Sequence, residues 1–108
     1  MTPLSTMHCA PGGQAAALSD ADIRMQLDTL KDWQRRGGEI MKTFSFGNYH
    51  ETIAFVNASA WVSHREDHHP DLSVHYNKCV VAYSTHDAGG ITLNDFICAA
   101  KLDALQSI

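Results

Sequence analysis

Histidines occur in two short segments of this sequence that also carry carboxylates and hydroxyl groups. The first segment is Glu66-Asp67-His68-His69-Pro70-Asp71, and the second, further along the chain, is Ser84-Thr85-His86-Asp87. Histidine has an unperturbed pKa near 6.5, so an imidazole can both give and take a proton close to neutral pH. The two segments therefore predict acid–base chemistry, provided that the fold brings them together.

The proline after the histidine doublet predicts where the preceding helix ends. Pro70 disfavours the helical conformation in the residue before it, so a helix that arrives from the N-terminal side should end at or near His68. At a helix end the backbone changes direction, and both rings can then point into one cleft. The alternative is a helix terminus at which imidazolium groups stabilise the last carbonyls.

A metalloenzyme is the first competing interpretation. His64 and His68 are separated by four residues, the spacing of the two zinc ligands in an H-E-x-x-H helix. That motif requires Glu directly after the first histidine, and Arg65 occupies the position here. We therefore expect no metal.

Nucleophilic catalysis is a weaker alternative. Ser84 and Thr85 lie beside His86, but neither occupies a G-x-S-x-G turn. Cys79 and Cys98 fall within an expected strand and an expected helix, where small core residues are usual. Several histidines without a metal or a nucleophile favour proton transfer, as in the dehydration, isomerisation or tautomerisation of a small molecule.

Length and composition indicate one folded domain. The chain has 108 residues, of which 44% are apolar and 19% charged, enough for a single core. A net charge of −4 argues against a nucleic-acid-binding surface. The three cysteines form no C-x-x-C pair, and no segment is typical of a membrane span or a signal peptide. These features predict a cytoplasmic protein that binds neither nucleic acid nor membranes.

The order of the expected elements predicts an α+β fold. Residues 1–18 contain Pro3, Pro11 and Gly12-Gly13 and are expected to form a flexible tail, whereas residues 19–108 form the domain. Helices are expected at 19–31, from 48 over about five turns, and from 92 onward. Strands are expected at 33–35, 39–46, 72–76 and 79–85, the last two joined by a two-residue turn at Asn77-Lys78. The order α-β-β-α-β-β-α favours a four-stranded antiparallel sheet with three helices packed on one face.

Helix caps and helix faces are also predicted. Ser19, Asn48 and Thr92 each precede an acidic residue by three positions, an arrangement that caps a helix N-terminus. In the second helix an apolar line at 3.6-residue spacing predicts the buried face and ends at His64. The members of this line are Tyr49, Ile53, Val56, Ala60 and His64.

Several of these segments together resemble one enzyme family, the pterin-4a-carbinolamine dehydratases. The resemblance rests on His68-His69-Pro70-Asp71, Tyr76-Asn77-Lys78, Ser84-Thr85-His86, Gly90-Ile91-Thr92 and Asp95, and it extends over roughly residues 19–105. It implies dehydration of 4a-hydroxytetrahydrobiopterin, the product of aromatic amino acid hydroxylases, to quinonoid dihydropterin. It also implies an α+β fold with a four-stranded antiparallel sheet, no metal or other cofactor, and a homodimer or homotetramer.

The resemblance implies that His68, His69 and His86 are catalytic. We expect His68 and His86 near the departing hydroxyl and the ring N5, and His69 in contact with the pterin. Further residues are expected to bind substrate or to support the site: Pro70, Asp67, Ser84, Thr85, Asp95 and His64. Two departures concern substrate details, because some relatives carry a carboxylate where this chain has His64 and an aromatic residue where it has Leu72.

Two other functions stay open at this point. Animal members of the family also bind a homeodomain transcription factor, so a protein-binding regulatory role is one alternative. A dehydratase-like protein that acts on another pterin, for example near molybdopterin metabolism, is the second.

Overall fold

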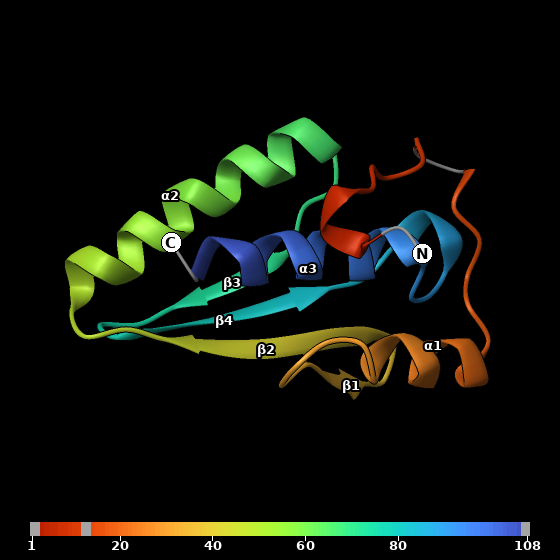
Figure 1. The fold of residues 1–108 in the computed structure, drawn as a ribbon, viewed down its shortest axis with the longest axis horizontal. Coiled ribbons are helices and arrows are strands. Elements are labelled where there is room, and N and C mark those ends of the chain that lie inside the picture. The colour runs from red at the N-terminus through yellow and green to blue at the C-terminus, as the bar shows by residue number, and fades with distance from the viewer. Residues whose placement is uncertain (1–2, 12–13, 107–108) are drawn as a thin grey trace.

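The computed structural model describes residues 3–11 and 14–106, which form three α-helices, four strands and two short 3-10 helices. In chain order the elements are η1 Leu4–Thr6, α1 Asp20–Leu27, β1 Gln34–Arg36, β2 Glu39–Ser45, α2 Tyr49–Glu66, β3 Asp71–Val74, β4 Lys78–Tyr83, η3 His86–Ala88 and α3 Leu93–Gln106. The predicted order α-β-β-α-β-β-α is confirmed (Figure 1).

The strands form one antiparallel sheet in the order β1-β2-β4-β3, so the α+β prediction is confirmed. In the register between the two central strands, Ile40 pairs with Tyr83 and Phe44 pairs with Cys79. Helices α2 and α3 lie over one face of the sheet, and α1 lies beside β1 (Figure 1). Ile23 of α1 is buried in the same hydrophobic core.

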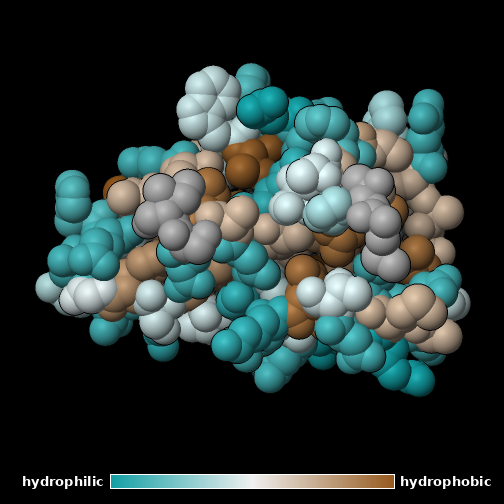
Figure 2. Space-filling view, viewed as in Figure 1, coloured by the Kyte–Doolittle hydropathy of each residue, from teal (hydrophilic) through white to brown (hydrophobic). Residues whose placement is uncertain are grey.

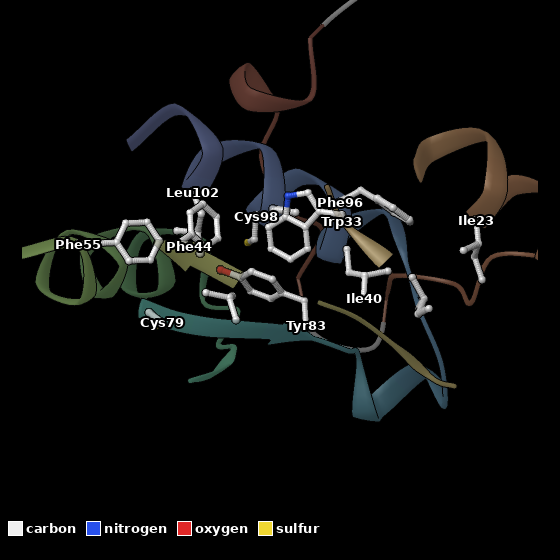
Figure 3. Packing of buried hydrophobic residues seen from close by; sticks show 13 residues of the cluster. Ile23, Trp33, Ile40, Phe44, Phe55, Cys79, Tyr83, Phe96, Cys98 and Leu102 are labelled. Carbon is white, nitrogen blue, oxygen red and sulfur yellow. The ribbon is translucent and has the colours of Figure 1, made fainter. Parts of the chain in front are cut away.

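The core lies between the sheet and α3, because strand alternation turns every second side chain of β2 and β4 toward the helices. Figure 3 shows Phe44, Tyr83 and Trp33 in this layer, with Cys98 and Leu102 of α3 facing them. All but Trp33 of these five side chains are fully buried. Helix α3 therefore packs directly on the sheet, and this packing determines where the residues at its N-terminus lie.

The capping predicted for α2 is confirmed, but its predicted buried face is wrong. The side chain of Asn48 accepts a hydrogen bond from the Glu51 N–H at 2.9 Å. The face that packs on the protein is instead made by Thr52, Phe55, Ser59 and Ser63. The three hydroxyls of this face donate to backbone carbonyls, including that of Ser59 for Ser63, so their burial leaves no hydroxyl unsatisfied. Because only one of these four residues is apolar, the spacing of apolar residues could not identify this face.

The predicted two-residue turn at Asn77-Lys78 is also wrong. Strand β3 ends at Val74, which pairs with Cys79, and Lys78 already belongs to β4. The N–H of His75 donates to the carbonyl of Lys78 at 2.8 Å, so residues 75–77 form the connection. Asn77 lacks the following glycine that a tight type I′ turn favours.

The N-terminal segment runs across α3 toward the C-terminal end of α2 (Figure 1). Lys101 Nζ of α3 donates a hydrogen bond to the carbonyl of Ser5 at 3.0 Å. The predicted division into a flexible tail, residues 1–18, and a domain from residue 19 stays a prediction.

The face of the molecule seen in Figure 2 is of mixed polarity. Hydrophobic residues gather in the middle of the face shown in Figure 2, and the lower edge of this face is largely hydrophilic. Within residues 3–11 and 14–106, no helix has the length and apolar character needed to span a membrane.

Candidate active site

A pocket of about 250 Å³ lies where the end of α2, the end of β4 and the start of α3 meet. It is lined by residues from both histidine segments, from the N-terminal segment and from α3. The lining residues are Ala10, Asp67, His68, His69, Ser84, Thr85, His86, Asp87 and Asn94. The fold therefore brings the two predicted segments together.

The end of α2 turns the histidine doublet toward this pocket. The helix ends at Glu66, and Asp67 follows in the left-handed conformation with φ 50° and ψ 44°. The N–H groups of Asp67 and His68 both reach back to the carbonyl of Ser63. A left-handed residue after a helix reverses the chain and satisfies the last carbonyls, and aspartate tolerates this conformation better than most residues. The prediction that the helix ends near His68 is confirmed.

A buried carboxylate holds the His68 ring. Asp95 is fully buried, and its Oδ1 lies 2.6 Å from Nε2 of His68. Its other oxygen, Oδ2, accepts hydrogen bonds from the Thr85 hydroxyl and from the Thr92 N–H, each at 2.9 Å. Because a carboxylate accepts hydrogen bonds, the contact favours a proton on Nε2 and leaves Nδ1 as the nitrogen available for exchange. Asp95 therefore caps α3 and orients His68 at the same time.

Tyr83 supports the same imidazole from one side, a role that we did not predict. The rings of Tyr83 and His68 are 5.7 Å apart between centroids and nearly parallel, at 10°. Burial is the main reason why the pKa of the Tyr83 phenol is raised, so the hydroxyl stays protonated. Alternation along β4 places Tyr83 in the core, but no local signal indicates that a histidine from another segment covers it.

The second segment presents His86 on a short turn. Thr85 is buried and pairs with Gly90 across the turn, its N–H donating to the Gly90 carbonyl at 3.2 Å. His86 begins η3 and is exposed, and the turn closes at Gly89 with φ 72°, which glycine adopts without strain. The imidazole of His86 therefore borders the pocket from a loop that Thr85 anchors to the core.

Only some of the remaining predicted residues line the pocket. His69 is exposed and Ser84 half-buried, and both line the pocket, whereas Pro70 and His64 do not belong to the lining. His64 is exposed on α2, with its ring 6.1 Å from that of Trp61. In the part of the chain that the structure describes, no three His, Cys, Asp or Glu side chains are grouped as metal ligands.

Three lining residues, Ala10, Asp87 and Asn94, were absent from the predicted site. Asp87 belongs to the second histidine segment, but we assigned it no role from the sequence. Asn94 lies in the first turn of α3, between Thr92 and Asp95, where the sequence indicated only the start of a helix. Ala10 comes from the N-terminal segment, far from the rest in sequence, and an alanine carries no chemical signal.

Comparison with known proteins identifies the family. The family described as Pterin 4 alpha carbinolamine dehydratase matches residues 16–105 of this sequence. The chain belongs to this family. A protein of Chromobacterium violaceum, provisionally named pterin-4-alpha-carbinolamine dehydratase, is 58% identical over 94% of each chain. A Nitrosospira multiformis protein with the same provisional name is 54% identical over 97% of this chain and 94% of its own.

Solved structures of pterin dehydratases share the fold. A protein from Brucella melitensis, described as a transcriptional coactivator/pterin dehydratase, superposes with a TM-score of 0.81 at 27% identity, over 83% of this chain and 98% of its own. A pterin dehydratase-like protein described as a RuBisCO assembly factor of the alpha-carboxysome has a TM-score of 0.58, also at 27% identity. That match covers 68% of this chain and 86% of the other.

Proposed function

We propose that this member of the pterin dehydratase family dehydrates 4a-hydroxytetrahydrobiopterin to quinonoid dihydropterin. The observation that supports the proposal most strongly is the pocket in which His68, oriented by the buried Asp95, shares one lining with His69 and His86. A fixed imidazole and further titratable rings around one small cavity are suited to proton transfer.

The proposed reaction needs two proton transfers. The hydroxyl on C4a must gain a proton to depart as water, and the ring N5 must lose one. Two imidazoles in opposite protonation states supply both transfers within one site. We propose that His68 and His86 carry them and that His69 contacts the pterin, while Asp95 acts on the substrate only through His68.

The supporting residues have correspondingly indirect roles in this proposal. Asp67 turns the chain after α2, Pro70 holds that turn, and Thr85 connects Asp95 to the loop that bears His86. Ser84 lines the pocket and can hydrogen-bond to the pterin. His64 is exposed on α2, so we propose for it at most a role at the surface.

The experiment that tests the activity follows the ultraviolet absorbance of 4a-hydroxytetrahydrobiopterin as it decays, with and without protein. Acceleration above the spontaneous rate supports the proposal, and an unchanged rate refutes it. Repeating the measurement with a pterin that carries a different side chain separates a biopterin enzyme from one that acts on another pterin, such as in molybdopterin metabolism.

A protein-binding role is the second candidate function. It is favoured by the described functions of the two structural relatives, coactivator and RuBisCO assembly factor, and by exposed aromatic residues. Trp61 on α2 is 68% exposed and Tyr76 in the loop before β4 is 66% exposed. Binding does not require the His86 imidazole, so a variant His86→Ala that keeps its fold separates the two functions: a dehydratase loses activity, and a binding module keeps its partner.

We also propose that the protein forms a homodimer or homotetramer in the cytoplasm and serves an aromatic amino acid hydroxylase. Strand β3 lies at one edge of the sheet, and its Leu72 and Val74 are exposed. An exposed apolar edge strand is a natural place for a second copy to pair. Light scattering of the purified protein tests this, since a monomeric mass at assay concentration would contradict it.

A further inference from the structure

We propose that residues 8–10 of the N-terminal segment form one wall of the substrate pocket, and that Asn94 and Glu66 are the positioning residues that hold this wall. The inference rests on the proposed function, because it assigns to the segment a share in binding the pterin. Ala10 lines the same pocket as His68 and His86, although the three lie far apart in the sequence.

The first anchor is the side-chain amide of Asn94. It accepts a hydrogen bond from the Ala10 N–H at 2.9 Å and donates one to the Ala10 carbonyl at 3.0 Å. Both polar groups of one amide thereby meet both backbone groups of one residue, as in a rung between antiparallel strands. Asn94 is only 5% exposed with the segment in place, so the backbone groups of Ala10 take the place of water as partners of its amide.

The second anchor is the carboxylate of Glu66, the last residue of α2. Its side chain is 4% exposed, yet it accepts a hydrogen bond from the Cys9 N–H at 2.7 Å and lies 3.0 Å from Nδ1 of His8. Nζ of Lys101 in α3 lies 3.8 Å from the same carboxylate. A buried carboxylate is costly unless it is paired and hydrogen-bonded, so Glu66 stabilises the docked position of residues 8–9.

A third contact fixes the segment at a sulfur pair. Sγ of Cys9 lies 3.5 Å from Sγ of the buried Cys98 in α3. The hydrogen bond with the Cys9 thiol, together with burial, raises the pKa of Cys98, so this side chain remains a thiol and the two thiols share a weak hydrogen bond. Because a disulfide bond is about 2.05 Å long, a small shift would allow an oxidant to join the two sulfurs. The pair is therefore an experimental means of pinning the segment.

The expected consequence concerns substrate binding and not proton transfer. The pocket of about 250 Å³ is small, since ligand sites commonly enclose roughly 300–1,000 Å³ and cover most of the ligand surface. A wall contributes contacts that the ground state and the transition state share equally. Removing such contacts raises KM and leaves kcat nearly unchanged.

Two variants release the wall by different routes. Asn94→Leu removes both hydrogen bonds from the α3 side, and Ala10→Pro removes the N–H donor from the segment without altering the folded core. Asn57→Leu is the matched control, because Asn57 is an exposed residue of α2 that does not line the pocket. Hydrogen exchange at the Cys9 amide reports whether the segment has left Glu66.

We expect faster hydrogen exchange at the Cys9 amide in both release variants. We also expect a KM about tenfold higher than that of the wild type, which is the effect of losing one neutral hydrogen bond. The kcat should stay within about twofold of the wild type. Oxidation of Ala10→Pro to the Cys9–Cys98 disulfide, with oxidised glutathione accepting the two electrons and two protons, should restore the low KM. A purely structural role for the segment would not give this rescue.

Three results would overturn the inference while leaving the dehydratase intact. The first is a variant in which the Cys9 amide exchanges freely but KM is unchanged. The second is a Cys9 exchange rate that is unchanged in both Asn94→Leu and Ala10→Pro. The third is an oxidised Ala10→Pro protein in which the Cys9–Cys98 disulfide does not restore the low KM. If the wild type neither accelerates the reaction nor binds 7,8-dihydrobiopterin, the proposed function is refuted, and the inference about the pocket wall is refuted with it. If it binds this stable pterin without turnover, its Kd in the same variants tests the wall alone.

Discussion

Replacing Asp95 by asparagine is the most informative change in the proposed site, because the two side chains have nearly the same shape. One oxygen of Asp95 accepts from His68 at 2.6 Å, and the other accepts from Thr85 and Thr92 at 2.9 Å. Asparagine has only one oxygen, so it must place its NH₂ group on one of these two sides. Either placement leaves a donor facing a donor unless a partner changes its protonation.

The two placements have different costs. If the NH₂ group faces the backbone N–H of Thr92, a buried hydrogen bond of the α3 cap is replaced by a clash, which costs about 1–3 kcal/mol. If it faces His68 instead, the imidazole can move its proton from Nε2 to Nδ1 and accept the new hydrogen bond. The second placement is cheaper for folding, so we expect a loss of unfolding free energy of about 1–2 kcal/mol.

The same shift removes the base at Nδ1, the nitrogen that Asp95 leaves free in the wild type. General acid–base catalysis contributes about 10²–10⁴-fold, and we expect kcat of Asp95→Asn to fall within that range. The assays are dehydration kinetics, urea denaturation, and nitrogen-15 NMR of the His68 ring, which identifies the protonated nitrogen. Asp22→Asn on α1 is the control with the same change of charge. A variant that keeps wild-type kcat while its His68 proton has moved would refute the role that we assign to Asp95.

Three further results are expected. Glu66 has a pKa below its usual value of 4.5, because hydrogen bonds from Cys9 and His8 and the charge of Lys101 outweigh the opposing effect of burial. Its contribution to docking the N-terminal segment is therefore complete above pH 4.5 and is lost as the pH falls through the lower folded-state pKa. The Cys9 amide shift in NMR should show this step, and Glu66→Gln should abolish it; a step that persists in the variant would assign it to another group. Phe44→Ala should lower the unfolding free energy, measured by urea denaturation, by about 3–5 kcal/mol, because Phe44 is fully buried and its ring lies 4.6 Å from that of Phe55. A loss below about 1 kcal/mol would contradict this packing. His64→Ala should keep dehydration activity within about twofold of the wild type, because His64 is exposed and does not line the pocket. A loss of tenfold or more would show that this side chain acts in the site.

Features set by local physics could be predicted from the sequence. The proline after His69 predicted the end of α2, and the acidic residue three positions after Thr92 predicted the cap of α3. Both signals act over a few residues, so no knowledge of the rest of the fold is needed. They placed the histidine doublet and Asp95 at the ends of two helices, where the structure joins them.

Features that depend on tertiary contacts could not be predicted in this way. The buried face of α2 consists largely of hydroxyl-bearing residues whose donors bond to the backbone, so an apolar line selected the neighbouring face and with it His64. Tyr83 covers His68 from a strand that the sequence marks only as core. The N-terminal wall is held by Asn94 and Glu66, whose contacts with Ala10 and Cys9 span most of the chain.

The central claim is that His68 and His86 transfer protons to and from one pterin. The most direct measurement is stopped-flow ultraviolet absorbance of 4a-hydroxytetrahydrobiopterin with the wild type, His68→Ala and His86→Ala, after circular dichroism has shown that each variant is folded. We predict that the wild type accelerates the decay and that each variant loses about 10²–10⁴-fold of that acceleration. Folded variants that retain the wild-type rate would contradict the account.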